Sequence, residues 1–69
     1  MRTMMIEVTE HRTFKDAVEY AKKHKLVAIQ VGRSFVTTTE SETDRIAEAG
    51  VEFAYLFIKD GKYLTVPIN

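Results

Sequence analysis

Residues 51–68 read VEFAYLFIKDGKYLTVPI, the most apolar part of the chain and the part that decides its fold class. Residues 51–58 predict a central strand, and Asp60-Gly61 is a strong signal for a two-residue hairpin turn before a last strand over 62–68. Pro67 has no N–H to donate to a β-ladder, so we expect this last strand at a sheet edge.

The length of the turn decides which side chains of the hairpin share a face. A two-residue turn places three apolar pairs opposite each other: Phe57–Leu64, Tyr55–Val66 and Phe53–Ile68. We expect this face to form the core beneath the helices. The other face then carries Ala54, Leu56, Ile58, Tyr63 and Thr65. A three-residue turn would shift the register by one residue and change these pairs.

The strands upstream follow from alternation and turn signals. Residues 3–9 alternate between apolar and polar side chains, as a half-buried strand does, and residues 10–12 are typical of a loop. Residues 26–31 and 35–39 predict a second hairpin around Gly32-Arg33, with the positive φ of a type II′ turn at the glycine. In that hairpin Ile29 opposes Val36 on the presumed core face.

Two helices follow from capping residues and apolar spacing. Thr13 is expected to cap the first helix, which ends near His24 within a basic run that complements the helix dipole. Its apolar stripe has the i, i+3, i+4, i+7 spacing of one helix face: Phe14, Ala17, Val18 and Ala21. A short second helix runs through Glu48 and is followed by Gly50, where a left-handed residue is needed. Two capping pairs fit its start, Thr39 with Glu42 and Ser41 with Asp44.

The predicted fold is a single α+β domain over residues 1–69, a small two-layer sandwich with both helices on one face of the sheet. Its element order is β-α-β-β-α-β-β. The first six elements follow the order of ferredoxin-like domains, and a C-terminal edge strand is added. This likeness concerns element order alone and implies no function.

Composition excludes several classes of protein. The chain has 69 residues, 45% of them apolar, which is too apolar for a disordered segment. It has no cysteine, so disulfides and thiolate metal sites are excluded. No apolar run approaches the roughly 20 residues of a membrane span, and no signal-peptide pattern is present, so we expect a cytoplasmic protein.

Charge is balanced in total but uneven along the chain. Ten basic and ten acidic residues give a net charge of zero, which argues against strong non-specific binding to nucleic acid. Basic residues are in excess over residues 1–34 and acidic residues over 35–69. This asymmetry fits ends that meet in an assembly, and it equally fits an ordinary scatter of solvated charges.

No motif for catalysis, a cofactor or a metal is found, so we expect a protein that is not an enzyme and has no cofactor. His11 is expected in a solvated loop, and the helix dipole accounts for His24. The hydroxyl-rich residues 37–41 fit a strand end followed by a helix cap. No glycine-rich loop precedes that helix, and its acidic residues would repel a phosphate.

The most informative surface is the sheet face opposite the predicted helices. Five of its apolar residues are candidates for a protein interface: Met5, Phe35, Leu56, Ile58 and Tyr63. Exposed together, the apolar side chains of this face would form a larger patch than soluble monomers usually tolerate. We therefore expect a protein-binding module whose sheet face or edge strand contacts a copy of itself or another chain. In the second case it would be an accessory or inhibitor subunit, of the kind that phages encode.

Two alternatives remain open. The first is a nucleic-acid-binding module that uses a basic group of four side chains: Lys22, Lys23, Lys25 and Arg33. Steep salt dependence of its affinity would distinguish such a module. The second is a ligand-sensing or enzyme-subunit domain with a pocket between protomers, which a small molecule would stabilise against heat.

Overall fold

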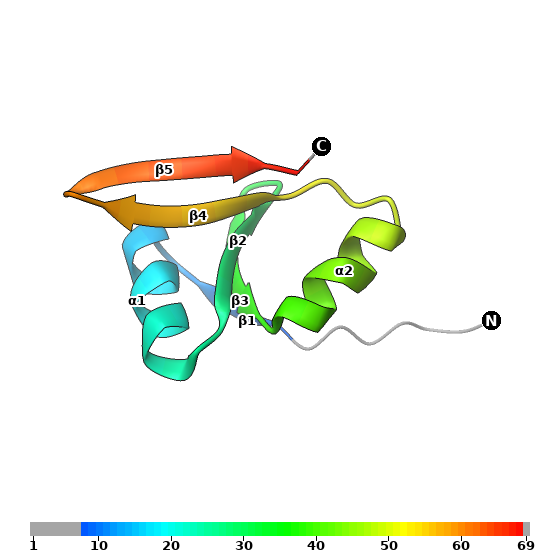
Figure 1. The fold of residues 1–69 in the computed structure, drawn as a ribbon, viewed down its shortest axis with the longest axis horizontal. Helices are drawn as coiled ribbons and strands as arrows, with labels where there is room; N and C mark the ends of the chain where they lie inside the picture. Colours follow the sequence, from blue (N-terminus) through cyan, green and yellow to red (C-terminus); the bar gives the residue numbers. More distant parts are fainter. Residues whose placement is uncertain (1–7, 69) are drawn as a thin grey trace.

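The structure, a computed structural model, describes residues 8–68. Its elements in chain order are β1 (Thr9–His11), α1 (Phe14–His24), β2 (Val27–Val31), β3 (Ser34–Thr38), α2 (Glu40–Glu48), β4 (Ala54–Lys59) and β5 (Lys62–Pro67). The strands form one antiparallel sheet in the order β1-β3-β2-β4-β5 (Figure 1). The predicted α+β class and the element order are therefore confirmed, and Pro67 lies in an edge strand as expected.

The first helix forms where its cap and apolar stripe predict. The Thr13 side chain accepts a hydrogen bond from the backbone N–H of Asp16 at 3.1 Å. Ala17, Val18 and Ala21 are buried, so the predicted stripe faces the core. The helix ends at His24, and the C-cap residue Lys25 is left-handed with φ 55° although it is not glycine.

Both hairpins have the predicted two-residue turns. Asp60 and Gly61 have φ of 52° and 73°, the two positive values that define a type I′ turn. Phe57 therefore pairs with Leu64, and Tyr55 with Val66. In the other hairpin Gly32 has φ 61°, and Ile29 pairs with Val36 as expected.

Two details of the strands differ from the prediction. Glu10 and His11 were expected in a loop, but they belong to β1 and pair with Val36 and Phe35. A polar strand of three residues at a sheet edge leaves little apolar pattern to detect. Most of the strand expected over 3–9 lies outside the described residues. The strand expected over 51–58 begins only at Ala54, but β4 lies between β2 and β5, so its predicted central position is confirmed.

The two helices lie on opposite faces of the sheet, so the expectation that they share one face is wrong. The α1 face of the sheet carries Ala28, Phe35, Leu56 and Ile58, which pack with the buried stripe of α1. The α2 face carries Ile29, Val36, Phe53 and Tyr55, which pack with Ile46 of α2. Figure 1 shows α1 and α2 on either side of β2 and β3.

Chain topology explains this arrangement. Strands β1 and β2 are parallel with β3 between them, and β3 and β4 are parallel with β2 between them. The two crossover connections, β1–α1–β2 and β3–α2–β4, therefore move the chain in the same direction across the sheet. They start from β1 and β3, which run in opposite directions. If both crossovers are right-handed, as such connections almost always are, α1 and α2 must lie on opposite faces of the sheet. In the ferredoxin-like arrangement the fourth strand would join the other side of the sheet, and both helices would share a face.

Candidate protein-binding surface

Of the interface residues expected from sequence, the four that the structure describes lie on the α1 face, and three of them belong to or pack against the core cluster under α1. Leu56 is only 3% exposed, and Phe35 and Ile58 pack against the same core cluster. Tyr63 is 57% exposed, but its ring stacks on Phe14 with centroids 5.0 Å apart. Met5 lies outside the described residues. The expectation that this face is uncovered is therefore wrong, because α1 crosses it.

A contiguous exposed apolar surface lies on the α2 face of the β4–β5 hairpin. Phe57, Leu64 and Val66 are 48%, 42% and 50% exposed, and Tyr55 is half-buried beside them. These four residues, which we call the hairpin patch, form two adjacent cross-strand pairs. Sequence reasoning identified this apolar row correctly but assigned it to the core.

The patch is open because α2 is short and lies over other strands. Its only large buried apolar side chain is Ile46, which packs on the cluster of Ile29, Val36 and Phe53. Tyr55 is at the margin of that cluster, and Phe57 lies two residues further along β4. The covered part of the α2 face thus ends where the hairpin patch begins. The thin apolar content of residues 40–48 was the sequence signal that this helix covers little of the sheet.

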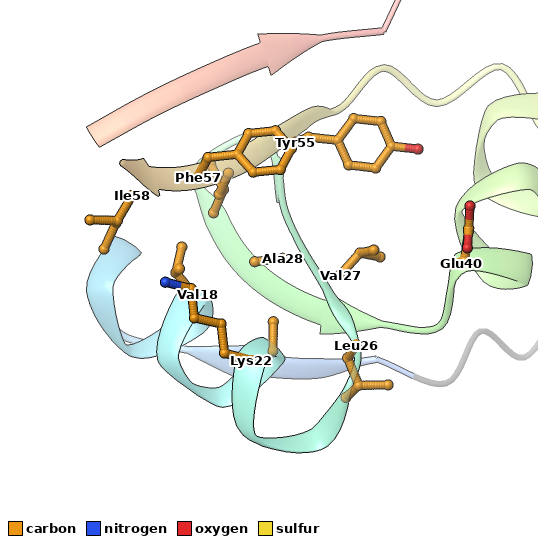
Figure 2. Close-up of a pocket in the computed structure, with 11 residues that line it drawn as sticks. Val18, Lys22, Leu26, Val27, Ala28, Glu40, Tyr55, Phe57 and Ile58 are labelled. Atoms are coloured by element: carbon orange, nitrogen blue, oxygen red, sulfur yellow. The ribbon is translucent and has the colours of Figure 1, made fainter. Parts of the chain in front are cut away.

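Opposite charges lie at the two ends of the hairpin patch. Lys59 and Lys62 pair across the turn and share the α2 face with Phe57 and Leu64, since side chains alternate along a strand. At the other end Glu40, the first residue of α2, lines a groove together with Tyr55. Figure 2 shows the Tyr55 ring extending from β4 toward the helix that carries Glu40.

This groove occupies the space where β2 and β4 separate. The two strands pair only at Ile29–Tyr55 and Gln30–Ala54, so the rest of the hairpin extends beyond β2. An open groove of about 350 Å³ results, and it is lined by Val27, Tyr55 and Phe57 and, from α1, by Val18, Ala21 and Lys22 (Figure 2). The groove is therefore continuous with the hairpin patch.

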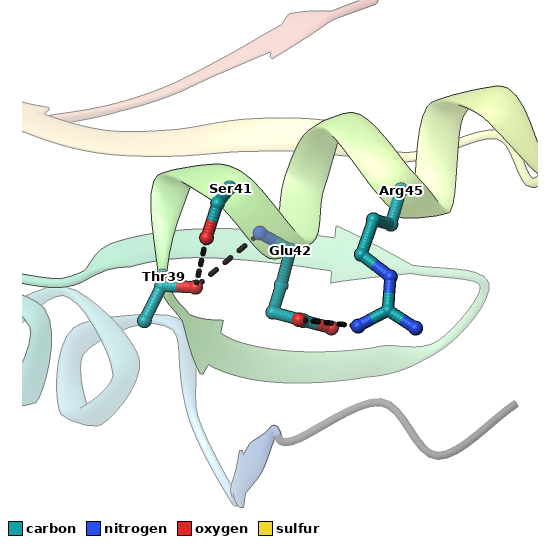
Figure 3. A network of polar contacts seen from close by, with 4 residues as sticks. All are labelled: Thr39, Ser41, Glu42 and Arg45. Atoms are coloured by element: carbon teal, nitrogen blue, oxygen red, sulfur yellow. Dashed lines mark hydrogen bonds and ion pairs between the residues drawn. The ribbon is translucent and has the colours of Figure 1, made fainter.

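Polar contacts hold the start of α2, and with it Glu40, in place (Figure 3). Thr39 caps the helix, because its hydroxyl accepts a hydrogen bond from the backbone N–H of Glu42 at 3.3 Å. The hydroxyl oxygens of Thr39 and Ser41 lie 3.1 Å apart. The Arg45 guanidinium donates to the carboxylate of Glu42 at 2.8 Å. Of the two capping pairs left open by the sequence, the structure selects Thr39 with Glu42.

The four basic residues of the nucleic-acid alternative do not form one group. Lys22, Lys23 and Lys25 lie at the C-terminal end of α1, directly before β2. Arg33 lies in the turn after β2, so the length of that strand separates it from the lysines. The structure therefore provides a three-lysine cluster at one end of the sheet and a single arginine at the other.

The two histidines contact one tyrosine of α1, the half-buried Tyr20. His11 Nε2 lies 2.9 Å from the hydroxyl oxygen of Thr37, a buried threonine, and the His11 ring is 4.8 Å from that of Tyr20. The His24 ring is 4.2 Å from the same tyrosine. His11 is thus a hydrogen-bonded strand residue, and the solvated loop position expected for it is wrong.

Within residues 8–68, no group of three side chains of the metal-binding types is close enough together to hold a metal ion. No helix in the described part of the chain has the length and apolarity needed to cross a membrane. No protein-family model matches the chain, and no curated protein or solved structure matches it either.

Proposed function

We propose that this chain is a small, non-enzymatic protein-binding module that acts through the hairpin patch. The observation that carries the proposal is the exposure of Phe57, Leu64 and Val66, which with the half-buried Tyr55 form two adjacent cross-strand apolar pairs. Single exposed apolar residues are ordinary on a protein surface, but a contiguous patch is often a binding site. Aromatic side chains at its centre are the residue type that contributes most to many protein interfaces.

The energetics of the hairpin support the same proposal. Beyond Tyr55 the two strands form a ribbon whose α1 face is packed by α1 and whose α2 face has no covering element among the described residues. A two-stranded ribbon gains much of its stability from burial of a face. Full burial of a side chain such as Phe57 or Leu64 contributes about 1.5–3 kcal/mol. A partner on the hairpin patch would complete this burial.

Site-specific photo-crosslinking tests the proposal directly. A photoreactive phenylalanine analogue replaces Phe57 in one variant and Val51 in a control, because Val51 is an exposed apolar residue outside the hairpin. We expect a covalent adduct with a polypeptide from position 57, and a much weaker one from position 51. We also expect Leu64→Thr to remove the adduct at position 57. Equal adducts from both positions, or none from position 57, would contradict the proposal.

A further inference from the structure

We infer that the partner of the hairpin patch is a second copy of this chain, placed antiparallel to the first about a twofold axis. This inference rests on the proposed function, and it adds the identity of the partner. An isologous dimer uses the same surface twice, so that surface must be complementary to itself after a half-turn. The distribution of apolar and charged side chains on the α2 face meets this requirement.

The apolar centre and the two charged ends lie in sequence along one face. Lys59 and Lys62 lie at the tip of the hairpin, four residues beyond Tyr55 along β4, which corresponds to about 13 Å. Glu40 lies at the opposite end, across the groove from Tyr55. Asp44 follows Glu40 by four residues, one turn along the same side of α2. The patch thus runs from a basic end through an apolar centre to an acidic end.

A half-turn about the centre of the patch brings unlike charges together. The Phe57–Leu64 and Tyr55–Val66 pairs of one copy then cover the same pairs of the other. The lysines of each tip approach the Glu40 and Asp44 carboxylates of the other copy, so each contact occurs twice. Asp60 also lies at the tip, but the two lysines leave it with a net positive charge. Parallel stacking of two copies would instead oppose lysine to lysine and carboxylate to carboxylate, which is unfavourable.

Charge reversal at one end at a time tests this arrangement. One variant carries Lys59→Glu and Lys62→Glu, and a second carries Glu40→Lys and Asp44→Lys. In the proposed dimer each variant opposes like charges at both contacts, so its self-association should weaken at least tenfold. An equimolar mixture of the two variants should associate again as a heterodimer, because every contact then joins unlike charges. Sedimentation equilibrium at low salt measures the association constants, since salt screens exposed charges.

Two controls make the comparison specific. Lys15→Glu with Lys23→Glu changes the net charge as much as the first variant does, but on the exposed side of α1, and it should leave self-association unchanged. A chain that carries Lys59→Glu, Lys62→Glu, Glu40→Lys and Asp44→Lys together should regain self-association, because its two ends again have opposite charges. Thermal melts monitored by circular dichroism show that each variant is folded.

Several results would overturn the inference. One is a wild-type protein that has the mass of a monomer at every concentration up to about 1 mM, a concentration at which even a weak dimer would form. Another is a mixture of the two variants that associates no better than either alone. If position 57 crosslinks to a different polypeptide while the chain remains a monomer, the self-association inference fails and the proposed binding function stands. If neither self-association nor an adduct occurs, both fail.

Discussion

Leu56 and Phe57 are consecutive residues of β4 whose side chains lie on opposite faces of the sheet. Leu56 is buried under α1, and Phe57 is half exposed on the hairpin patch. Because α1 covers the first and no described element covers the second, the same substitution should have very different effects at the two positions.

Leu56→Ser should lower the free energy of unfolding by about 3–5 kcal/mol, because it leaves a cavity and buries a hydroxyl. Phe57→Ser should lower it by less than about 1 kcal/mol, as exposed positions usually do. Urea denaturation of both variants measures the difference. Similar losses at the two positions would contradict the assignment of faces.

Phe14→Ala should lower the free energy of unfolding by about 3 kcal/mol. The Phe14 ring lies between Tyr63 and Phe35, with centroid distances of 5.0 and 6.0 Å, so it joins α1 to both hairpins. A double-mutant cycle with Tyr63→Leu should give a coupling of about 0.5–1.5 kcal/mol for the ring pair. A loss below about 1 kcal/mol for Phe14→Ala would show that this residue does not anchor the helix.

Thr39→Ala should destabilise the protein by about 1 kcal/mol, because it removes the cap of α2. Ser41→Ala is the matched control, since Ser41 contacts the Thr39 hydroxyl but does not cap the helix. Its effect should stay below about 0.5 kcal/mol. Thermal or urea unfolding compares the two, and a larger loss for Ser41→Ala would favour the other capping pair.

Lys25→Gly should stabilise the protein by up to about 1 kcal/mol, because glycine adopts the left-handed conformation without the steric cost that Lys25 bears. Gly50→Ala should destabilise the protein by a similar amount. Gly50 has φ 81°, and a Cβ there would meet no atom within 4 Å, so the cost is that of the backbone conformation alone. Opposite shifts of the urea midpoint are the expected result, and shifts of the same sign would contradict it.

Replacing Lys22, Lys23 and Lys25 together with Gln should change stability by less than about 1 kcal/mol, the loss of a favourable helix-dipole interaction. Crosslinking through position 57 should persist, because none of the three lysines belongs to the hairpin patch, although Lys22 lines the adjoining groove. Titration with single-stranded nucleic acid completes the test. Salt-dependent binding by the wild type that disappears in this variant would support the nucleic-acid alternative instead.

Features that depend on neighbouring residues were predictable from sequence. The cap and buried stripe of α1 and the registers of both hairpins follow from side-chain chemistry within a few positions, and the cap of α2 was narrowed to two candidate pairs. Asp60-Gly61 illustrates this, because both residues tolerate the positive φ of a type I′ turn, and the turn then determines the pairs along the whole hairpin.

The candidate site was predictable only in part. Sequence alternation placed Phe57, Leu64 and Val66 on one face and Leu56 and Ile58 on the other, and both rows are apolar. Two apolar rows of this kind contain no local signal of which one a helix will cover. The row of Leu56 and Ile58 was therefore predicted to be exposed, although Leu56 is buried and Ile58 is half-buried against the core cluster of α1.

The sequence by itself thus determined the order of the elements, the cap of α1, the two hairpins and the division of their strands into two faces. Only the tertiary structure decided that β4 pairs with β2 at Ile29 and Tyr55. This pairing is between residues 26 positions apart, so no local preference specifies it. Once β4 takes that place, the handedness of the crossover directs α2 to the face opposite α1. The short helix then covers Ile29, Val36 and Phe53 and leaves the hairpin patch open.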